Sequence, residues 1–262
     1  MSDFNRSPGA AWRGVGTDRA VAVDQGLRAY MIRVYNYMAI GVALTGVLAW
    51  LTYQMAGGDA IVVAGGRVSG LTPFGVAIFN PITSIVLFLG TLGLVFLISW
   101  RIDRLQPSTA LTLFMVYAAA LGVMLSSILL AYTYSSIARV FFISAASFGA
   151  LSLWGYTTKR DLSAFGTFLT IGLFGLVLAV IVEALLGAFG IHSGPFSFII
   201  SVVGVLVFAG LTAWDTQKIK EMYDVQDDGT VASRKAVMGA LTLYLDFINL
   251  FLFLLRLIGD RR

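Results

Sequence analysis

Seven runs of roughly twenty mostly apolar residues follow one another along this chain, separated by short polar segments. An α-helix of about 20 such residues crosses the hydrocarbon core of a bilayer, and it satisfies its own backbone hydrogen bonds there. The sequence therefore predicts an all-α integral membrane protein with seven transmembrane helices. The predicted spans are residues 33–56, 81–100, 108–131, 137–157, 163–187, 197–215 and 236–258.

The composition supports a membrane protein. Hydrophobic residues make up 58% of the 262 residues and charged residues only 12%, whereas a soluble domain carries roughly 25% charged residues. Residues 1–30 are polar and contain no apolar stretch followed by a small-residue cleavage site. We interpret them as a retained cytoplasmic tail rather than a signal peptide, and residues 31–262 as one membrane domain. The net charge of +4 is modest and no basic stripe is present, so nucleic acid is not an expected partner.

The basic residues indicate an orientation. Most of the 18 lysines and arginines fall on the cytoplasmic side when the N-terminus is placed there, as the positive-inside rule requires. The exceptions include Arg256, Arg261 and Arg262, which seven full spans would place outside. A re-entrant last helix would remove that conflict. Together with the absence of organellar targeting, this favours a multi-pass protein of the bacterial inner membrane with a cytoplasmic N-terminus.

Several kinds of site are excluded by residue counts. The chain has no cysteine, so it forms no disulfide or thiolate metal site, and its single histidine, His192, excludes sites that need two imidazoles. His192 also falls in a predicted loop, which argues against an intramembrane serine protease. An intramembrane aspartyl protease needs two aspartates, and that alternative stays open. No nucleotide-binding loop or EF-hand spacing is present, so no tightly bound cofactor is expected.

Ionisable side chains inside the predicted spans are few. Each costs at least about 2.5 kcal/mol near the centre of a helix in lipid. Asp246 lies about ten residues into the last span, roughly 15 Å from its cytoplasmic end, so its carboxylate does not reach water. Asn249 lies three residues on, on the same helical face. One stripe of the last helix is therefore polar, which marks it as a functional candidate.

Three other charged residues lie at the ends of spans. Asp215 lies near the cytoplasmic end of the sixth span, where an interfacial pair with Lys218 would also explain it. Arg101 closes the second span and fits a positive-inside anchor equally well. Glu183, near the outer end of the fifth span, either snorkels to the interface or lines a pathway.

Two motifs in the last fifty residues resemble those of a known family. The segment Leu243-Tyr-Leu-Asp-Phe-Ile-Asn-Leu-Phe-Leu-Phe-Leu-Leu-Arg256 closely resembles the signature of the Bax inhibitor family of membrane proteins. The segment Trp214-Asp-Thr-Gln-Lys-Ile219 is similar to that family's other acidic motif. The resemblance covers about residues 30–260. It implies a seven-helix fold in which the last helix is central and surrounded by the other six.

The resemblance also implies a function. The family includes bacterial members that act as pH-sensitive calcium leaks, in which aspartates of the last two helices pair and an arginine of the second helix latches them. By position these residues match Asp215, Asp246 and, more loosely, Arg101. Some bacterial relatives carry a further acidic residue in the second helix. This chain has none between Asn80 and Trp100, which leaves a conduction site there in doubt.

The chemistry of two adjacent carboxylates is consistent with pH sensing. Two carboxylates about 4 Å apart repel by about 4 kcal/mol at an effective dielectric near 20, which is enough to move the loss of a shared proton from acidic to near-neutral pH. The hypothesis is that the protonated pair, with Arg101 engaged, keeps the helices closed. Deprotonation adds charge, loosens the latch and lets cations pass. Calcium would contact Asp215 and Asp246 transiently, with Asn249 and Glu183 along the pathway.

The alternatives belong to other classes. Some family members regulate a membrane-anchored AAA protease or another membrane protein without transporting ions, and that function would depend on the N-terminal tail rather than on the aspartates. A hydrolase would lose product formation when either aspartate is changed. We favour the cation leak, a non-enzyme whose expected partners are membrane lipid, calcium ions and protons.

Overall fold

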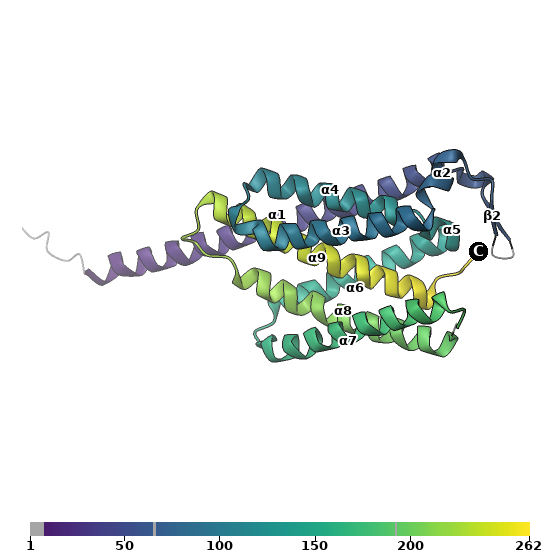
Figure 1. Ribbon diagram of the computed structural model, residues 1–262. Coiled ribbons are helices and arrows are strands. Elements are labelled where there is room, and N and C mark those ends of the chain that lie inside the picture. Colours follow the sequence, from purple (N-terminus) through teal and green to yellow (C-terminus); the bar gives the residue numbers. More distant parts are fainter. Residues whose placement is uncertain (1–7, 65–66, 192) are drawn as a thin grey trace, which may run out of the picture.

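The protein is described by a computed structural model that covers residues 8–64, 67–191 and 193–262, so His192 lies outside the described residues (Figure 1). The chain is a bundle of long helices with a two-stranded antiparallel hairpin at one end. The elements are α1 (Pro8–Met55), β1 (Val62–Ala64), β2 (Arg67–Ser69), α2 (Pro73–Ile78), α3 (Pro81–Arg101), α4 (Pro107–Leu125), α5 (Ile128–Ala131), α6 (Tyr134–Thr157), α7 (Ser163–Ala188), α8 (Gly194–Glu221) and α9 (Gly229–Ile258), with short 3-10 helices at Gly58–Ala60 (η1) and Ile102–Arg104 (η2).

The prediction of seven spanning helices is confirmed. Among the described residues, seven helical segments are long and apolar enough to cross a membrane. They are Gln25–Met55, Pro81–Arg104, Pro107–Ala131, Tyr134–Thr157, Ser163–Ala188, Gly194–Glu221 and Gly229–Ile258. Several extend further than predicted, because hydropathy marks the part of a helix that lies in lipid, whereas capping residues set its end.

The start of α9 illustrates this difference. The helix begins seven residues before the predicted span, where the carboxylate of Asp228 accepts hydrogen bonds from the backbone N–H groups of Thr230 and Val231. In the same way, α3 and α4 begin with Pro81 and Pro107, because proline fits the first turn of a helix. The helix α1 passes residue 30 without a break, so the proposed division into a tail and a membrane domain stays a prediction.

The last helix lies at the centre of the bundle, as the family resemblance implies. It packs mainly against α8, α1, α6 and α4, while α3 packs on α4 and α7 on α8. Half of the apolar window of α9 is buried within the protein, compared with 11% for α3 and for α7. The central position is therefore confirmed in outline, with four neighbouring helices in direct contact and two at the margin.

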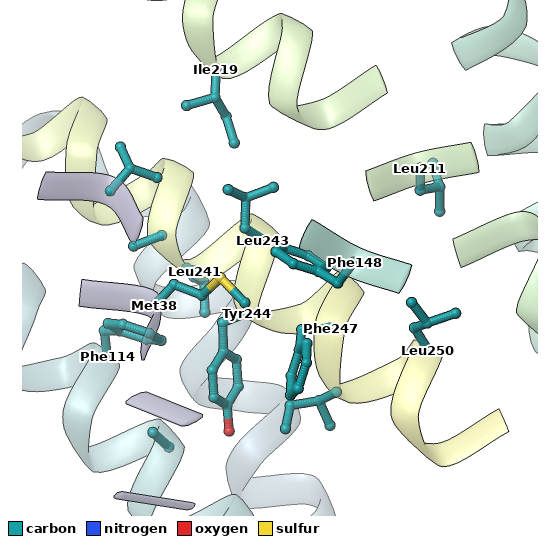
Figure 2. Close-up of a cluster of buried hydrophobic side chains, with 14 of the residues drawn as sticks. Met38, Phe114, Phe148, Leu211, Ile219, Leu241, Leu243, Tyr244, Phe247 and Leu250 are labelled. Carbon is teal, nitrogen blue, oxygen red and sulfur yellow. The ribbon is translucent and has the colours of Figure 1, made fainter. Parts of the chain in front are cut away.

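Large side chains of α9 fill the space between its neighbours (Figure 2). Tyr244 packs edge-on against Phe114 of α4, with ring centroids 5.4 Å apart, and its hydroxyl lies 2.6 Å from the Thr45 hydroxyl of α1. Phe247 packs in the same manner against Phe148 of α6 at 5.6 Å. These contacts hold the central helix on several sides and so fix the position of Asp246 between them.

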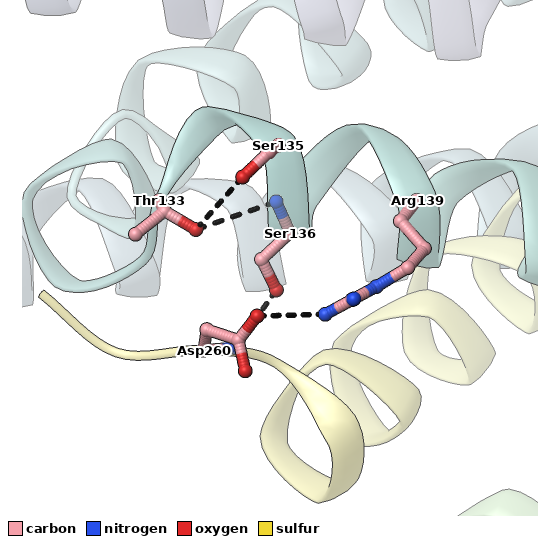
Figure 3. Close-up of polar contacts among 5 residues, drawn as sticks. All are labelled: Thr133, Ser135, Ser136, Arg139 and Asp260. Atoms are coloured by element: carbon pink, nitrogen blue, oxygen red, sulfur yellow. Dashed lines mark hydrogen bonds and ion pairs between the residues drawn. The ribbon is translucent and has the colours of Figure 1, made fainter.

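The last helix runs the full length of the bundle, so the alternative of a re-entrant helix is wrong. Residue 262 and the N-terminal extension of α1 lie at opposite ends, which we call the C-terminal and N-terminal ends of the bundle (Figure 1). The residues after α9 are tied to the start of α6 (Figure 3): the Asp260 carboxylate pairs with Arg139 at 2.7 Å, and its backbone N–H donates to the Ser136 hydroxyl at 2.8 Å. Which end faces the cytoplasm stays a prediction.

Candidate functional site

The two predicted aspartates meet where α8 packs against α9. Asp215 and Asp246 are only 8% and 4% exposed, and their carboxyl groups lie close enough to interact directly. The Oδ2 atom of Asp246 is buried, and no donor group among the described residues reaches it. Because a carboxylate only accepts hydrogen bonds, the two groups can bond to each other only when one of them carries a proton.

The interfacial interpretation of Asp215 does not fit its surroundings. Lys218 lies close enough to act on Asp215 through its charge, yet none of the ion pairs among the described residues joins the two. The Lys218 ammonium group instead lies 5.0 Å from the ring centroid of Trp214. Asp215 is therefore a buried carboxyl group whose direct side-chain neighbour is a second carboxyl group.

Arg101 does not contact the pair in this conformation. It is the exposed last residue of α3, and within the described ranges it forms no ion pair and no side-chain hydrogen bond. The link that follows it meets α9 near residue 234, where the Arg234 Nε donates to the Leu105 carbonyl at 2.6 Å. From residue 234 to residue 246 is about 18 Å of helix. The predicted latch would therefore require α3 to move, and it stays a prediction.

The two residues predicted along a pathway are placed differently. The Asn249 amide donates to the Leu245 carbonyl of its own helix at 2.8 Å. Glu183 of α7 accepts hydrogen bonds from the Ser197 hydroxyl of α8 and from Arg256 of α9, the latter at 2.8 Å. Glu183 is therefore paired with an arginine and does not reach the interface as an isolated carboxylate. Its charge balances Arg256, one of the arginines that conflicted with the positive-inside rule.

Cavities lie on both sides of the carboxyl pair along the bundle. Glu183 and Arg256 line a cavity of about 380 Å³ at the C-terminal end, between α7, α8 and α9. A second cavity, of about 530 Å³, lies toward the N-terminal end between α1 and α6 and is lined by Arg28, Tyr35 and Ser152, among others. Neither cavity includes an aspartate of the pair in its lining.

A row of hydroxyl groups next to the pair was not predicted from the sequence. The Tyr35 hydroxyl of α1 lies 2.6 Å from that of Ser152 on α6, which lies 2.9 Å from that of Thr216 on α8. The Thr216 hydroxyl then donates to the Thr212 carbonyl at 2.7 Å. The row connects the N-terminal cavity to the residue beside Asp215. In the sequence these residues are only isolated hydroxyl side chains in three apolar runs, and no spacing rule relates one to another.

The helices α6 and α8 are also in close contact beside the carboxyl pair. A Cβ atom at Gly155 of α6 would lie 2.2 Å from the Ala213 carbonyl oxygen, so the two backbones touch there. Toward the N-terminal end, the Gln217 side chain bonds to the backbone of Arg160 and Leu162, at 2.8 and 2.9 Å. The Asp215 side of the pair is therefore held by α6 and by the link before α7.

Among the described residues, the carboxyl pair has no third His, Cys, Asp or Glu ligand beside it. No group of three or more His, Cys, Asp or Glu side chains that could hold a metal ion occurs in the part of the chain that the structure describes. Ca²⁺ takes 6–8 oxygen ligands in a stable site.

Comparison with known proteins agrees with the resemblance found in the sequence motifs. The model of the family described as "Inhibitor of apoptosis-promoting Bax1" matches residues 27–262. The inner membrane protein YbhL of Escherichia coli is 42% identical over 248 residues, which cover 94% of this chain and 97% of that protein. Protein RP147 of Rickettsia prowazekii is 42% identical over 246 residues, 94% of this chain and 95% of its own. A protein of Caulobacter vibrioides is 41% identical over 267 residues, the full length of both.

Proposed function

The chain belongs to the Bax inhibitor family of membrane proteins, and from this premise we propose that it is a pH-sensitive cation leak of the inner membrane, with calcium as the expected ion. The gate in this proposal is the carboxyl pair of Asp215 and Asp246. The inner-membrane location is proposed because the relative YbhL is named an inner membrane protein and because this chain has seven apolar helices.

The observation that carries the proposal is the buried contact between two carboxyl groups. At about 4 Å and an effective dielectric near 20, two ionised carboxylates repel by about 4 kcal/mol. A shared proton removes this repulsion and lets one carboxyl group donate a hydrogen bond to the other. The pair therefore favours one proton in the closed arrangement, and loss of that proton opposes the packing of α8 on α9.

The surrounding contacts hold α8 as well as α9, so the α8–α9 contact itself is the part that would yield. Asp215 lies on a helix whose neighbouring residues are bonded to α6 and to the link before α7. Repulsion across the pair therefore acts on the α8–α9 contact. Separation there would expose a path past carboxylate oxygens, the ligands that Ca²⁺ prefers. Arg101 would set the pH of opening in conformations where α3 brings it closer.

The proposal is tested by calcium flux into liposomes that contain the purified protein, measured from pH 6 to pH 8. The variants are Asp215→Asn, Asp246→Asn and, as a matched control, Asp103→Asn, which changes an exposed aspartate between α3 and α4. We expect flux to rise with pH in the wild type and in the control, and to lose that dependence in the other two variants. Unchanged pH dependence in both pair variants would refute the gate.

The second candidate function is that of a regulator that binds a membrane-anchored AAA protease or another membrane protein. The observation in its favour is that α1 continues as a helix beyond the bundle at the N-terminal end (Figure 1). This function predicts that removal of residues 1–20 abolishes binding of the partner, while Asp215→Asn and Asp246→Asn leave it intact.

A further inference from the structure

A third cavity lies away from the carboxyl pair, in the C-terminal half of the bundle. It has a volume of about 290 Å³ and lies between α1, α5, α6 and α9. Its lining is almost entirely apolar and includes Gly46, Leu129, Phe142 and Ile248. At about 30 Å³ for a group the size of a water molecule, it holds a chain of roughly ten methylenes.

The cavity opens toward the lipid rather than toward water. Trp50 and Phe142, which line it, are 50% and 71% exposed, and both belong to helical segments long and apolar enough to cross a membrane. Its walls are thus continuous with the lipid-facing surface of the bundle. A cavity lined by such groups does not hold water, and a Cβ atom at Gly46 would meet no other atom within 4 Å. The space is therefore available to a hydrocarbon chain.

One cationic group lies at the rim of this cavity. Tyr134 lines the cavity, and the guanidinium group of Arg262 lies 4.7 Å from the centroid of its ring. Arg262 also donates to the Tyr53 hydroxyl at 3.2 Å, and none of the ion pairs among the described residues involves it. The Asp59 carboxylate accepts a hydrogen bond from the Tyr134 hydroxyl at 3.0 Å. The guanidinium therefore has capacity for an anionic group.

We propose that this cavity binds one acyl chain of a phospholipid from the leaflet at the C-terminal end, with the phosphate at Arg262. An apolar slot that opens to lipid, with an unpaired arginine at its rim, matches a molecule that combines a hydrocarbon chain with an anionic headgroup. The bound chain would contact Phe247, Ile248 and Phe251 of α9. These residues lie on roughly the opposite side of α9 from Asp246, so the lipid would pack against the face of the central helix that points away from the carboxyl pair. The inference rests on the fold and is independent of ion conduction.

The test is native mass spectrometry of the purified protein in detergent, titrated with palmitoyl-oleoyl phosphatidylglycerol. Gly46→Phe fills the slot, whereas Gly90→Phe places the same ring in open space on α3. We expect the wild type and Gly90→Phe to retain one tightly bound lipid and Gly46→Phe to lose it. Equal retention by both variants overturns the cavity as the site.

The headgroup contact is tested in the same titration. Arg262→Gln should weaken binding about fivefold, since a basic residue near a phospholipid headgroup contributes about 1 kcal/mol. Arg261→Gln, which removes the same charge from a residue that lines the cavity beside α8, should leave binding unchanged. Titration with oleate distinguishes a free fatty acid from a phospholipid. If oleate binds as tightly as phosphatidylglycerol, or Arg262→Gln binds normally, the phospholipid assignment is wrong.

Discussion

If the carboxyl pair holds one proton in the folded protein, the free energy of unfolding must depend on pH. An exposed carboxyl group in the unfolded chain is fully ionised above about pH 6, so the folded state binds up to one proton more than the unfolded state at that pH. Stability then falls as pH rises for as long as the folded state keeps that proton, and it levels off once the proton is lost. The slope reaches at most about 1.36 kcal/mol per pH unit, or about 2.7 kcal/mol between pH 6 and pH 8.

Asp246→Asn removes this dependence, because the amide leaves no second negative charge beside Asp215 and supplies a permanent donor. The variant should therefore be insensitive to pH over the same range and more stable than the wild type at pH 8. The gain is bounded by the repulsion of about 4 kcal/mol between two carboxylates in contact. The assay is reversible unfolding by sodium dodecyl sulfate in mixed micelles, at pH 6, 7 and 8. Equal slopes in the wild type and the variant would refute the shared proton.

Three further predictions use the same unfolding assay. Gly155→Val should destabilise the protein by several kcal/mol, since its side chain would meet the Ala213 carbonyl, whereas Gly149→Val on the same helix meets nothing within 4 Å; equal effects would contradict the close α6–α8 contact. Glu183→Gln should cost about 1–2 kcal/mol because it leaves Arg256 half-buried without its carboxylate, and Arg256→Gln in the same chain should recover part of that loss. Asp260→Asn should change stability by less than about 1 kcal/mol, because its ion pair with Arg139 is exposed on both sides; a larger loss would show that the pair is not solvated.

The membrane fold could be predicted from the sequence because hydropathy alone determines which segments enter lipid. The ends of α8 and α9 could not, because the helices continue through polar residues to caps such as Asp228. The prominence of Asp246 was also predictable, since a carboxyl group in the middle of an apolar span is too costly to occur without a partner. That its partner is Asp215 came from the family resemblance, because no spacing rule relates residues on two different helices.

Contacts between helices were beyond sequence reasoning. The hydroxyl row joins Tyr35, Ser152 and Thr216, which lie on three helices far apart in the chain. Glu183 and Arg256 form a pair across 73 residues, although each had seemed isolated at the end of its own span. For Arg101 a motif position suggests a contact with the pair, but in this structure the side chain is exposed at the end of α3, at the margin of the bundle, and the latch stays a prediction.

The most direct test of the central claim is whether the wild-type protein conducts calcium at all. Purified protein in liposomes, loaded with a calcium indicator and compared with protein-free liposomes of the same lipid, is followed from pH 6 to pH 8. The account predicts calcium entry above the protein-free level that increases as pH rises and the carboxyl pair loses its proton. Entry equal to that of protein-free liposomes at every pH would contradict it and would favour the regulator that acts through the N-terminal helix.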